Sequence, residues 1–234
     1  MMEAIKVSFE LKSPLIFDMP ISLDALLAFA LYQETDDLHV AHEELPLKRT
    51  GGVWHASQIR MEGPVMYQSV DFSMSLKESD MDKRLFAPGR SNRYSYIDQV
   101  RGEHKANLDR YPGLVSKTNK VHFFAFGDKE KIEALLRSNV FSLGKKHQQG
   151  YGSISSLTVE SADDDFSLYH PEMGVMRPIP IDLVLPFEIS SQKTASELTA
   201  FAPPYYQTEQ KLCYVPSSIV YTAMDIEQDE DDFF

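Results

Sequence analysis

Residues 143–154, with the sequence LGKKHQQGYGSI, combine three glycines with two lysines, a histidine and two glutamines. Glycine accepts positive φ angles and lets backbone N–H groups approach a ligand closely. Successive N–H groups in such a turn can bind an anion, and the flanking lysines add positive charge. The residue types therefore predict contact with the phosphates of a nucleic acid, with an ordinary turn as the structural alternative.

Within this loop each residue type has its own expected role. We expect Lys145 and Lys146 to neutralise phosphate, and the N–H groups of residues 150–152 to donate to phosphate oxygens. The ring of Tyr151 either stacks on a base or packs in the interior. The predicted RNA-binding residues of the loop are Gly144, Lys145, Lys146, His147, Gln148, Gln149, Gly150, Tyr151 and Gly152.

Two nucleotide-binding motifs do not fit this loop. The order GxxxxGK[ST] of a P-loop is absent from it. A dinucleotide-binding GxGxxG motif follows a strand and opens a helix, whereas these glycines precede a predicted strand. The loop is therefore not a nucleotide site of either kind.

A second feature is the basic segment between residues 83 and 120. It holds nine lysines and arginines against three acidic residues, a local charge of +6 in a chain whose net charge is −12. Distant charges are screened by salt, so a polyanion responds to the local patch. Cations interleaved with aromatic rings suit single-stranded nucleic acid, and a solvated hairpin is the alternative. The predicted RNA-binding residues here are Arg84, Arg90, Arg93, Tyr94, Arg101 and Lys105.

The elements that position both features follow from hydrophobic periodicity. Two helices are expected, one capped by Ser22 and supported by Asp24 in its first turn, and one beginning after Gly127 and Asp128. Their ranges are 23–33, with Leu23, Leu26, Leu27, Ala30 and Leu31 on one face, and 129–138, with Ile132, Leu135 and Leu136 facing inward. The predicted strands are 3–11, 54–59, 65–76, 121–126 and 153–160, with residues 60–64 as a connection.

This order predicts an α+β fold, a ferredoxin-like (RRM-like) domain over residues 1–160. A long insertion over residues 78–120 interrupts it. Residues 161–224 are expected to form a β and irregular extension, with a polar hinge at 161–165, an edge strand within 176–184 and an extended or hairpin arm at 201–215. Residues 225–234 form an acidic tail that we expect to be disordered.

Composition limits the class of protein. No apolar run approaches the roughly 18 residues of a membrane span, so no membrane partner is expected. The chain has one cysteine and no recognisable signal peptide, which predicts a cytoplasmic location without disulfides. The HVAHEE sequence at 39–44 lacks the spacing of a zinc motif, so a solvated loop and no metal or other cofactor are expected.

The phrases PISLDALLAFAL at 20–31 and MRPIP at 176–180, with the glycine loop at 144–152, resemble the RAMP superfamily of CRISPR proteins. The chain is most similar to the small backbone subunit of type IV effector complexes. That subunit is the counterpart of the family that binds the 5′ handle of the guide RNA in class 1 complexes. The resemblance covers roughly residues 3–185.

The resemblance implies a non-catalytic subunit without a cofactor. The implied partners are crRNA, target DNA through the guide complex, and the backbone filament subunit and large subunit. The loop at 144–152 corresponds to the family's glycine-rich loop, and the insertion at 78–120 to its thumb. Glutamine and histidine stand where many relatives place arginine in this loop.

Two other functions remain open from the sequence. A metal-independent endoribonuclease of this fold would draw on the candidate groups His104, His122, His147, Tyr94 and Lys105, because histidine suits proton transfer near neutral pH. His122 lies in an apolar strand, however, where a packed or edge residue is expected. A protein-interaction module would instead use the arm at 201–215 and the acidic tail.

Overall fold

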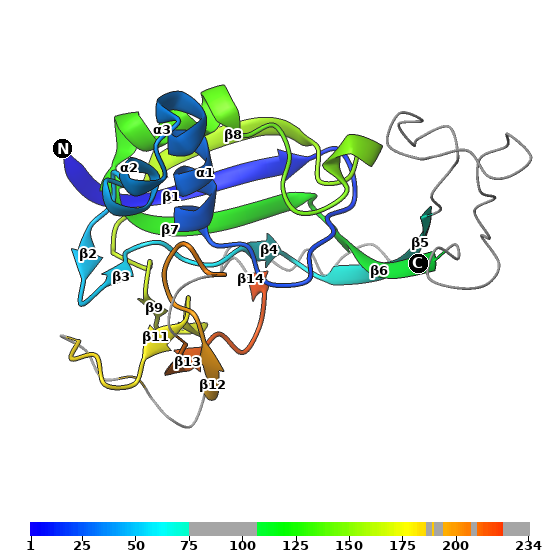
Figure 1. Cartoon of the computed structure of the whole chain (residues 1–234). Coiled ribbons are helices and arrows are strands. Elements are labelled where there is room, and N and C mark those ends of the chain that lie inside the picture. Colours follow the sequence, from blue (N-terminus) through cyan, green and yellow to red (C-terminus); the bar gives the residue numbers. More distant parts are fainter. Residues whose placement is uncertain (75–106, 186–188, 190–193, 207–209, 222–234) are drawn as a thin grey trace, which may run out of the picture. The chain divides into compact units, whose positions relative to one another are not determined.

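The computed structural model of the chain describes residues 1–74, 107–185, 189, 194–206 and 210–221 (Figure 1). The chain divides into two compact units. One consists of Met1–Tyr67 and Leu114–Phe234, and the other of Gln68–Gly113. The first unit holds the predicted glycine loop, and the second holds most of the predicted basic segment.

The first unit is built on a five-stranded sheet in the order β14-β4-β7-β1-β8. In this sheet β1 runs antiparallel to both β7 and β8, β4 runs antiparallel to β7, and β14 runs parallel to β4. The strands span Met2–Leu11 (β1), Arg60–Glu62 (β4), Lys120–Asp128 (β7), Ile154–Ser161 (β8) and Val220–Tyr221 (β14). Mixed strands and helices agree with the predicted α+β class.

Helices α1 (Leu23–Thr35) and α3 (Lys129–Asn139) lie on one face of this sheet (Figure 1). Both begin at the predicted residue. The core lies between them and the sheet, where alternate β1 side chains are buried. The Asp128 carboxylate accepts a hydrogen bond from the Lys131 N–H and caps α3. Ser22 occupies the N-cap position of α1, but its side chain makes no capping hydrogen bond.

The second strand of the sheet is not where the sequence pattern places it. Strand β3 (Val53–Trp54) pairs with β2 (Arg49–Thr50), and β4 begins only at Arg60, within the predicted connection. Residues 54–59 are all buried. Their backbone N–H groups donate to several elements instead of one ladder, including the carbonyls of Phe124, Met176 and Ile21. A continuous buried run indicates burial but does not specify which partner the backbone takes.

The predicted loop around residues 39–44 is a helix, α2 (Leu38–Glu43). Asp37 caps it, since one carboxylate oxygen accepts from the N–H groups of His39 and Val40 at 2.8 and 3.3 Å. Six residues are too few to show a helical hydrophobic period, so the pattern gave no signal.

The C-terminal extension forms short strands. Of the predicted edge strand only Ile179–Pro180 (β11) forms, and it lies at the edge of a sheet ordered β11-β13-β12. Strand β13 (Lys211–Val215) belongs to the predicted arm and pairs antiparallel with β12 (Ala195–Thr199). Strands β9 (Tyr169–His170) and β10 (Gly174–Val175) form a separate pair. The acidic tail at 225–234 lies outside the described residues.

Strands β5 (Val65–Met74) and β6 (Asn107–Ser116) form a two-stranded sheet, most of which belongs to the second unit. The predicted strand at 65–76 is therefore present as far as Met74. Arg110 makes a two-point contact with Asp71, at 2.8 Å from Nε and 3.3 Å from Nη2, and the rings of Phe72 and Tyr111 meet edge to face. Most of the insertion at 78–120 lies outside the described residues.

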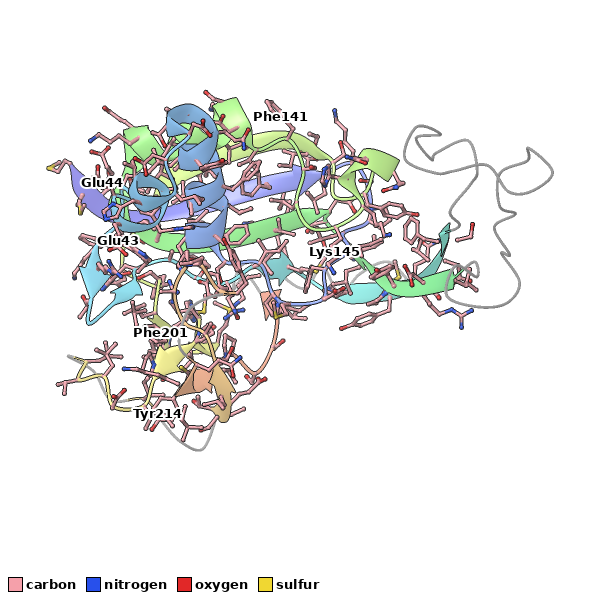
Figure 2. All side chains as sticks on the ribbon, in the orientation of Figure 1. Glu43, Glu44, Phe141, Lys145, Phe201 and Tyr214 are labelled. Atoms are coloured by element: carbon pink, nitrogen blue, oxygen red, sulfur yellow. The ribbon has the colours of Figure 1, made fainter. Side chains whose placement is uncertain are left out.

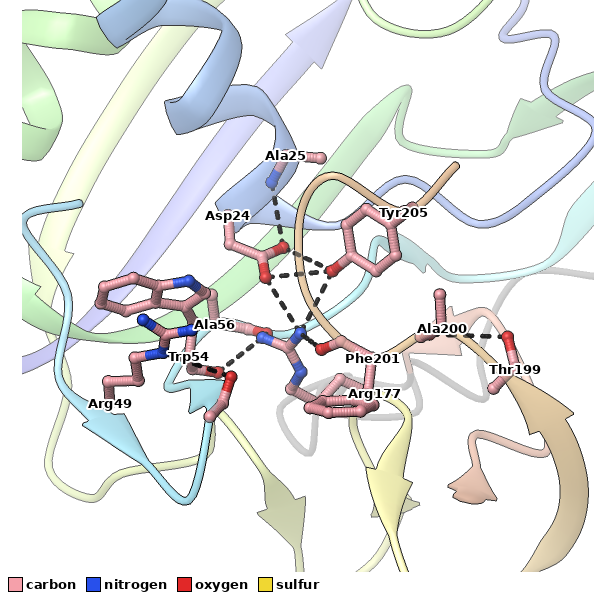
Figure 3. A network of polar contacts seen from close by, with 11 residues as sticks. Asp24, Ala25, Arg49, Trp54, Ala56, Arg177, Thr199, Ala200, Phe201 and Tyr205 are labelled. Atoms are coloured by element: carbon pink, nitrogen blue, oxygen red, sulfur yellow. Dashed lines mark hydrogen bonds and ion pairs between the residues drawn. The ribbon is translucent and has the colours of Figure 1, made fainter. Parts of the chain in front are cut away.

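A buried ion pair joins the extension to the first helix (Figure 3). The side chains of Arg177 and Asp24 are both fully buried, and Arg177 Nη2 lies 2.9 Å from Asp24 Oδ2. The Tyr205 hydroxyl donates to Asp24 at 2.9 Å, and Arg177 Nη1 donates to the carbonyls of Trp54 and Ala56. Burial, together with the Asp24 charge, raises the pKa of Tyr205. The phrases at 20–31 and 176–180 thus each supply one charge of this pair.

Candidate nucleic-acid interface

The glycine loop follows α3 and leads into β8. Leu143 is buried at its start, and a 3-10 helix, η3 (His147–Gln149), forms its middle. Lys146, just before η3, and Gly150, just after it, both have left-handed backbone angles, with φ of 61° and 89°. The loop therefore contains two sharp reversals within five residues.

Glycine is required at two loop positions by packing as well as by backbone angle. A Cβ atom on Gly144 would lie 2.2 Å from the Ile16 carbonyl oxygen, and one on Gly152 would lie 1.9 Å from the Leu143 carbonyl oxygen. At Gly150 no atom lies within 4 Å of the added Cβ. Two of the three loop glycines are therefore explained by close packing of the backbone, without a ligand.

Three backbone donors predicted to bind phosphate already donate within the chain. The N–H groups of Gly150 and Tyr151 donate to the carbonyls of His147 and Lys146, at 2.9 and 3.3 Å. The N–H group of Gly152 donates to the Pro14 carbonyl at 2.9 Å. Each of these three N–H groups therefore closes a turn or docks the loop in this structure, and the side chains of the loop are the better candidates for phosphate contact.

The loop is docked on the segment that follows β1. The Lys145 N–H group donates to the Ile16 carbonyl at 2.6 Å, and the Lys12 N–H group donates to the Ser153 carbonyl at 2.8 Å. The Ser153 N–H group donates to Ser13 Oγ at 3.0 Å. These bonds hold the loop in one place on the first unit.

The two lysines have different surroundings. The Lys145 ammonium group forms an ion pair with the Asp18 carboxylate, and both side chains are about half exposed. Lys145 is labelled in Figure 2. Lys146 is half-buried. A phosphate approaching Lys145 therefore competes with Asp18.

The exposed part of the loop is η3 and the glycine after it. His147, Gln148, Gln149 and Gly150 are all exposed, whereas Tyr151 is half-buried. The first N–H groups of a helix have no acceptor within it, so those of His147 and Gln148 make no hydrogen bond inside η3. Imidazole and amide side chains can both donate to phosphate and contact base edges. The loop therefore presents polar donors on a fixed backbone.

The structure brings only part of the predicted interface into view. Lys117 is exposed, and Arg110 in the second unit is engaged with Asp71. The other predicted basic and aromatic contacts lie outside the described residues, namely Arg84, Arg90, Arg93, Tyr94, Arg101 and Lys105.

The histidines proposed for a nuclease are dispersed. His122 is buried, as expected for a packed residue of β7, and His147 lies on the exposed loop. His104 lies outside the described residues. Burial, helped by the nearby charge of Lys6, lowers the pKa of His122 to about 4. The two described histidines belong to different elements, and no contact joins them.

The described residues lack two features that would indicate other classes of protein. Among them no three histidine, cysteine, aspartate or glutamate side chains cluster in a way that could hold a metal ion. No helix in the same part of the chain is both long enough and apolar enough to cross a membrane.

Comparison with known proteins gives the family. No curated protein matches the chain. Residues 3–216 match the family model described as CRISPR type IV associated protein Csf3. That match covers most of the chain, including both phrases of the buried ion pair and the glycine loop. The chain therefore belongs to the Csf3 family of type IV CRISPR-associated proteins.

Proposed function

We propose that this protein is a non-catalytic subunit of a type IV CRISPR ribonucleoprotein that binds the 5′ handle of crRNA. In this role it organises the backbone and large subunits for RNA-guided recognition of DNA. Family membership supports the type IV complex. The observation that carries RNA binding is the loop, where the exposed polar residues 147–149 and two lysines lie on a backbone held by hydrogen bonds.

The fold proposed for this role is a ferredoxin-like RAMP domain. Its support is the order of the sheet, in which β8, β1, β7 and β4 are neighbours. Along the chain, α1 follows β1 and α3 follows β7. A split βαβ unit with both helices on one face has this arrangement.

The proposed contact is mainly electrostatic. Phosphate contacts fix the position of an RNA but carry little sequence information, so base reading requires further side chains. We assign phosphate contact to Lys146. Lys145 makes the same contact when its ammonium group exchanges the Asp18 carboxylate for a phosphate. His147, Gln148 and Gln149 then contact phosphate or base edges. A separate contact with the guide is assigned to the arginines of the basic segment.

The loop contact is tested by reversing its charge in Lys145→Glu/Lys146→Glu. The matched control is Lys129→Glu/Lys131→Glu, which makes the same charge change at the opposite end of α3, about 16 Å along the helix axis. Binding of a fluorescent crRNA is measured by anisotropy over a range of salt concentrations. Loss of one or two phosphate contacts lowers the slope of log K against log salt by about 0.7 to 1.4 for single-stranded RNA.

We expect weaker binding and a smaller salt slope only in the loop variant. Equal effects in the two variants would show that binding responds to total charge. Unchanged binding in the loop variant would show that the glycine loop is purely structural, and the site assignment would then be wrong.

A further inference from the structure

Helix α1 is apolar on nearly every side. From Leu23 to Tyr32 its only charged residue is Asp24, which is buried in the ion pair with Arg177. A helix that is hydrophobic all round is normally covered all round, yet Phe29 is 51% exposed. One face of α1 is therefore left exposed where the sequence predicts an apolar neighbour.

This face forms one wall of a groove with a volume of about 270 Å³. Helix α2, which lies beside α1 (Figure 1), and the arm after residue 201 form the other walls. The α1 side chains are spaced by three and four residues, so they lie in one row along the helix. The lining consists of Ala25, Ala28, Phe29, Tyr32, Leu38, His42 and residues 203–206.

The groove collects large apolar side chains that are exposed. Phe29, Leu38 and Tyr206 come from its three walls and are 51%, 56% and 77% exposed. Clustered exposed apolar residues mark interaction sites, and aromatic anchors dominate the energy of protein interfaces. The volume is below the range of about 300–1,000 Å³ typical of small-molecule pockets. The groove therefore suits an apolar side chain that belongs to a larger partner.

The walls of the groove are held in place by internal contacts. The Tyr205 hydroxyl donates to Asp24 Oδ1 at 2.9 Å, which fixes the arm against α1. Asp37 caps α2, and Ala41 of the same helix is fully buried. Because the walls are already ordered, a partner would bind without the entropic cost of ordering them.

The helices around the groove carry negative charge. Residues 13–47 contain seven acidic residues and no lysine or arginine. Of these, Asp36 and Asp37 connect α1 to α2, and both are exposed. A hydrogen bond with Asp36 raises the pKa of Tyr32, so this carboxylate lies directly beside the groove wall. Such a field attracts a basic partner and repels a polyanion such as RNA.

We propose that this groove binds a basic amphipathic helix of a partner protein. Its apolar side chains pack between Phe29, Leu38 and Tyr206, and its lysines or arginines face Asp36 and Asp37. Recognition of a helix fits because no strand of the described residues lines the groove, so an extended peptide has no strand edge to pair with. The inference goes beyond RNA binding, since no residue of the glycine loop lines this groove.

The first test measures binding of three fluorescent peptides to the full chain by anisotropy. The first peptide is a helix former with leucine at helical spacing and lysine on its other faces. The second has glutamate in place of every lysine, and the third has alanine in place of every leucine. We expect only the first to bind, and Phe29→Ala to weaken its binding at least about tenfold, as loss of an aromatic anchor does.

Phe141→Ala is the matched control, because Phe141 is 72% exposed and lies outside the groove. This variant should bind the peptide like wild type. Both variants should bind crRNA equally well, so failure of this proposal can be distinguished from failure of the proposed function. No binding of the lysine peptide, equal binding of the glutamate peptide, or equal losses in the two variants would overturn the proposal.

The contribution of charge is measured with Asp36→Asn/Asp37→Asn. Asparagine tolerates the left-handed backbone of Asp36 and caps a helix as well as the aspartate at position 37 does, so the fold should be kept. We expect weaker binding of the lysine peptide and a smaller dependence of that binding on salt. Binding and salt dependence equal to wild type would overturn the assignment of a basic partner.

The second test identifies the partner in the assembled type IV complex. The photoreactive residue p-benzoylphenylalanine replaces Phe29, or Phe141 as the control, and the chain is co-expressed with its neighbouring CRISPR proteins and a repeat array. After irradiation, mass spectrometry maps the crosslinked peptide. We expect position 29 alone to crosslink to an amphipathic segment of another protein that is rich in lysine or arginine. Crosslinks to RNA, to a second copy of this chain or to an acidic segment, or no crosslink, would overturn the proposal.

Discussion

Arg177 brings a positive charge into a fully buried position and meets there a carboxylate, a hydroxyl and several backbone carbonyls. Taking a charge out of water costs several kcal/mol, which the partner charge and hydrogen bonds must offset. Because these groups come from α1, from residues 54–56 and from the extension, the pair ties together segments that are far apart in the sequence. The pair therefore explains why the largely apolar sequences at 20–31 and 176–180 each contain one charged residue.

Asp24→Asn tests this account because it removes the negative charge and keeps the side-chain shape. The variant leaves the buried guanidinium without its counter-charge, so the free energy of unfolding should fall by about 3–5 kcal/mol. Glu133→Gln is the control, since Glu133 pairs with Arg137 one turn away on the exposed face of α3. That change should cost less than about 0.5 kcal/mol. Urea denaturation that gave the two variants similar losses would contradict a structural role for the buried pair.

At the residue scale, the sequence indicated a polar, glycine-rich loop but not which hydrogen bonds its backbone makes. Glycines that pack against carbonyls and glycines that approach a ligand look the same in a sequence, because both require the absence of a Cβ atom. Arg177 was not anticipated as a partner of Asp24. The two residues are 153 positions apart, and no local pattern reports a contact of that range.

At the scale of elements, the loop and β8 depend on two glycines of different character. Gly152 has φ of 61° and a backbone oxygen where its Cβ would lie, whereas Gly150 has φ of 89° and open space. An alanine at Gly150 meets only the left-handed backbone cost, about 1–2 kcal/mol. An alanine at Gly152 meets that cost and also displaces the Leu143 carbonyl.

Gly152→Ala should therefore lower the melting temperature clearly more than Gly150→Ala does. Thermal denaturation followed by circular dichroism measures both. Equal shifts would mean that backbone angle alone sets the glycine requirement, and that the close approach of Gly152 to Leu143 carries no energetic weight.

The elements that were predicted best are long and apolar on at least one face. Strand β1 buries alternate residues and helix α3 buries Ile132, Leu135 and Leu136, so their periodicity is visible in the sequence. Strand β7 is buried along its whole middle, and its continuous apolar run predicted it. Strand β4 has three residues, and it follows a run that is buried throughout. Helix α2 depends on the Asp37 cap rather than on a repeated pattern. Short elements defined by tertiary contacts leave little periodic signal.

At the scale of the whole molecule, charge is divided unevenly along the chain. The segment 83–120 carries +6, and the remaining residues carry the balance of the net charge of −12. A polyanion is attracted by the local cations, because acidic residues beyond about 8–10 Å are screened at ordinary salt. The acidic net charge is therefore compatible with the proposed contact of RNA with the basic segment and the loop.

The central claim is that this Csf3-family protein binds the crRNA 5′ handle within a type IV complex. The most direct measurement is to express the tagged chain with its neighbouring CRISPR proteins and a repeat array, purify it, and sequence the RNA that remains bound. We predict short RNAs of uniform length that share one 5′ end. Partner proteins recovered without such RNA would contradict the claim and favour a protein-interaction module.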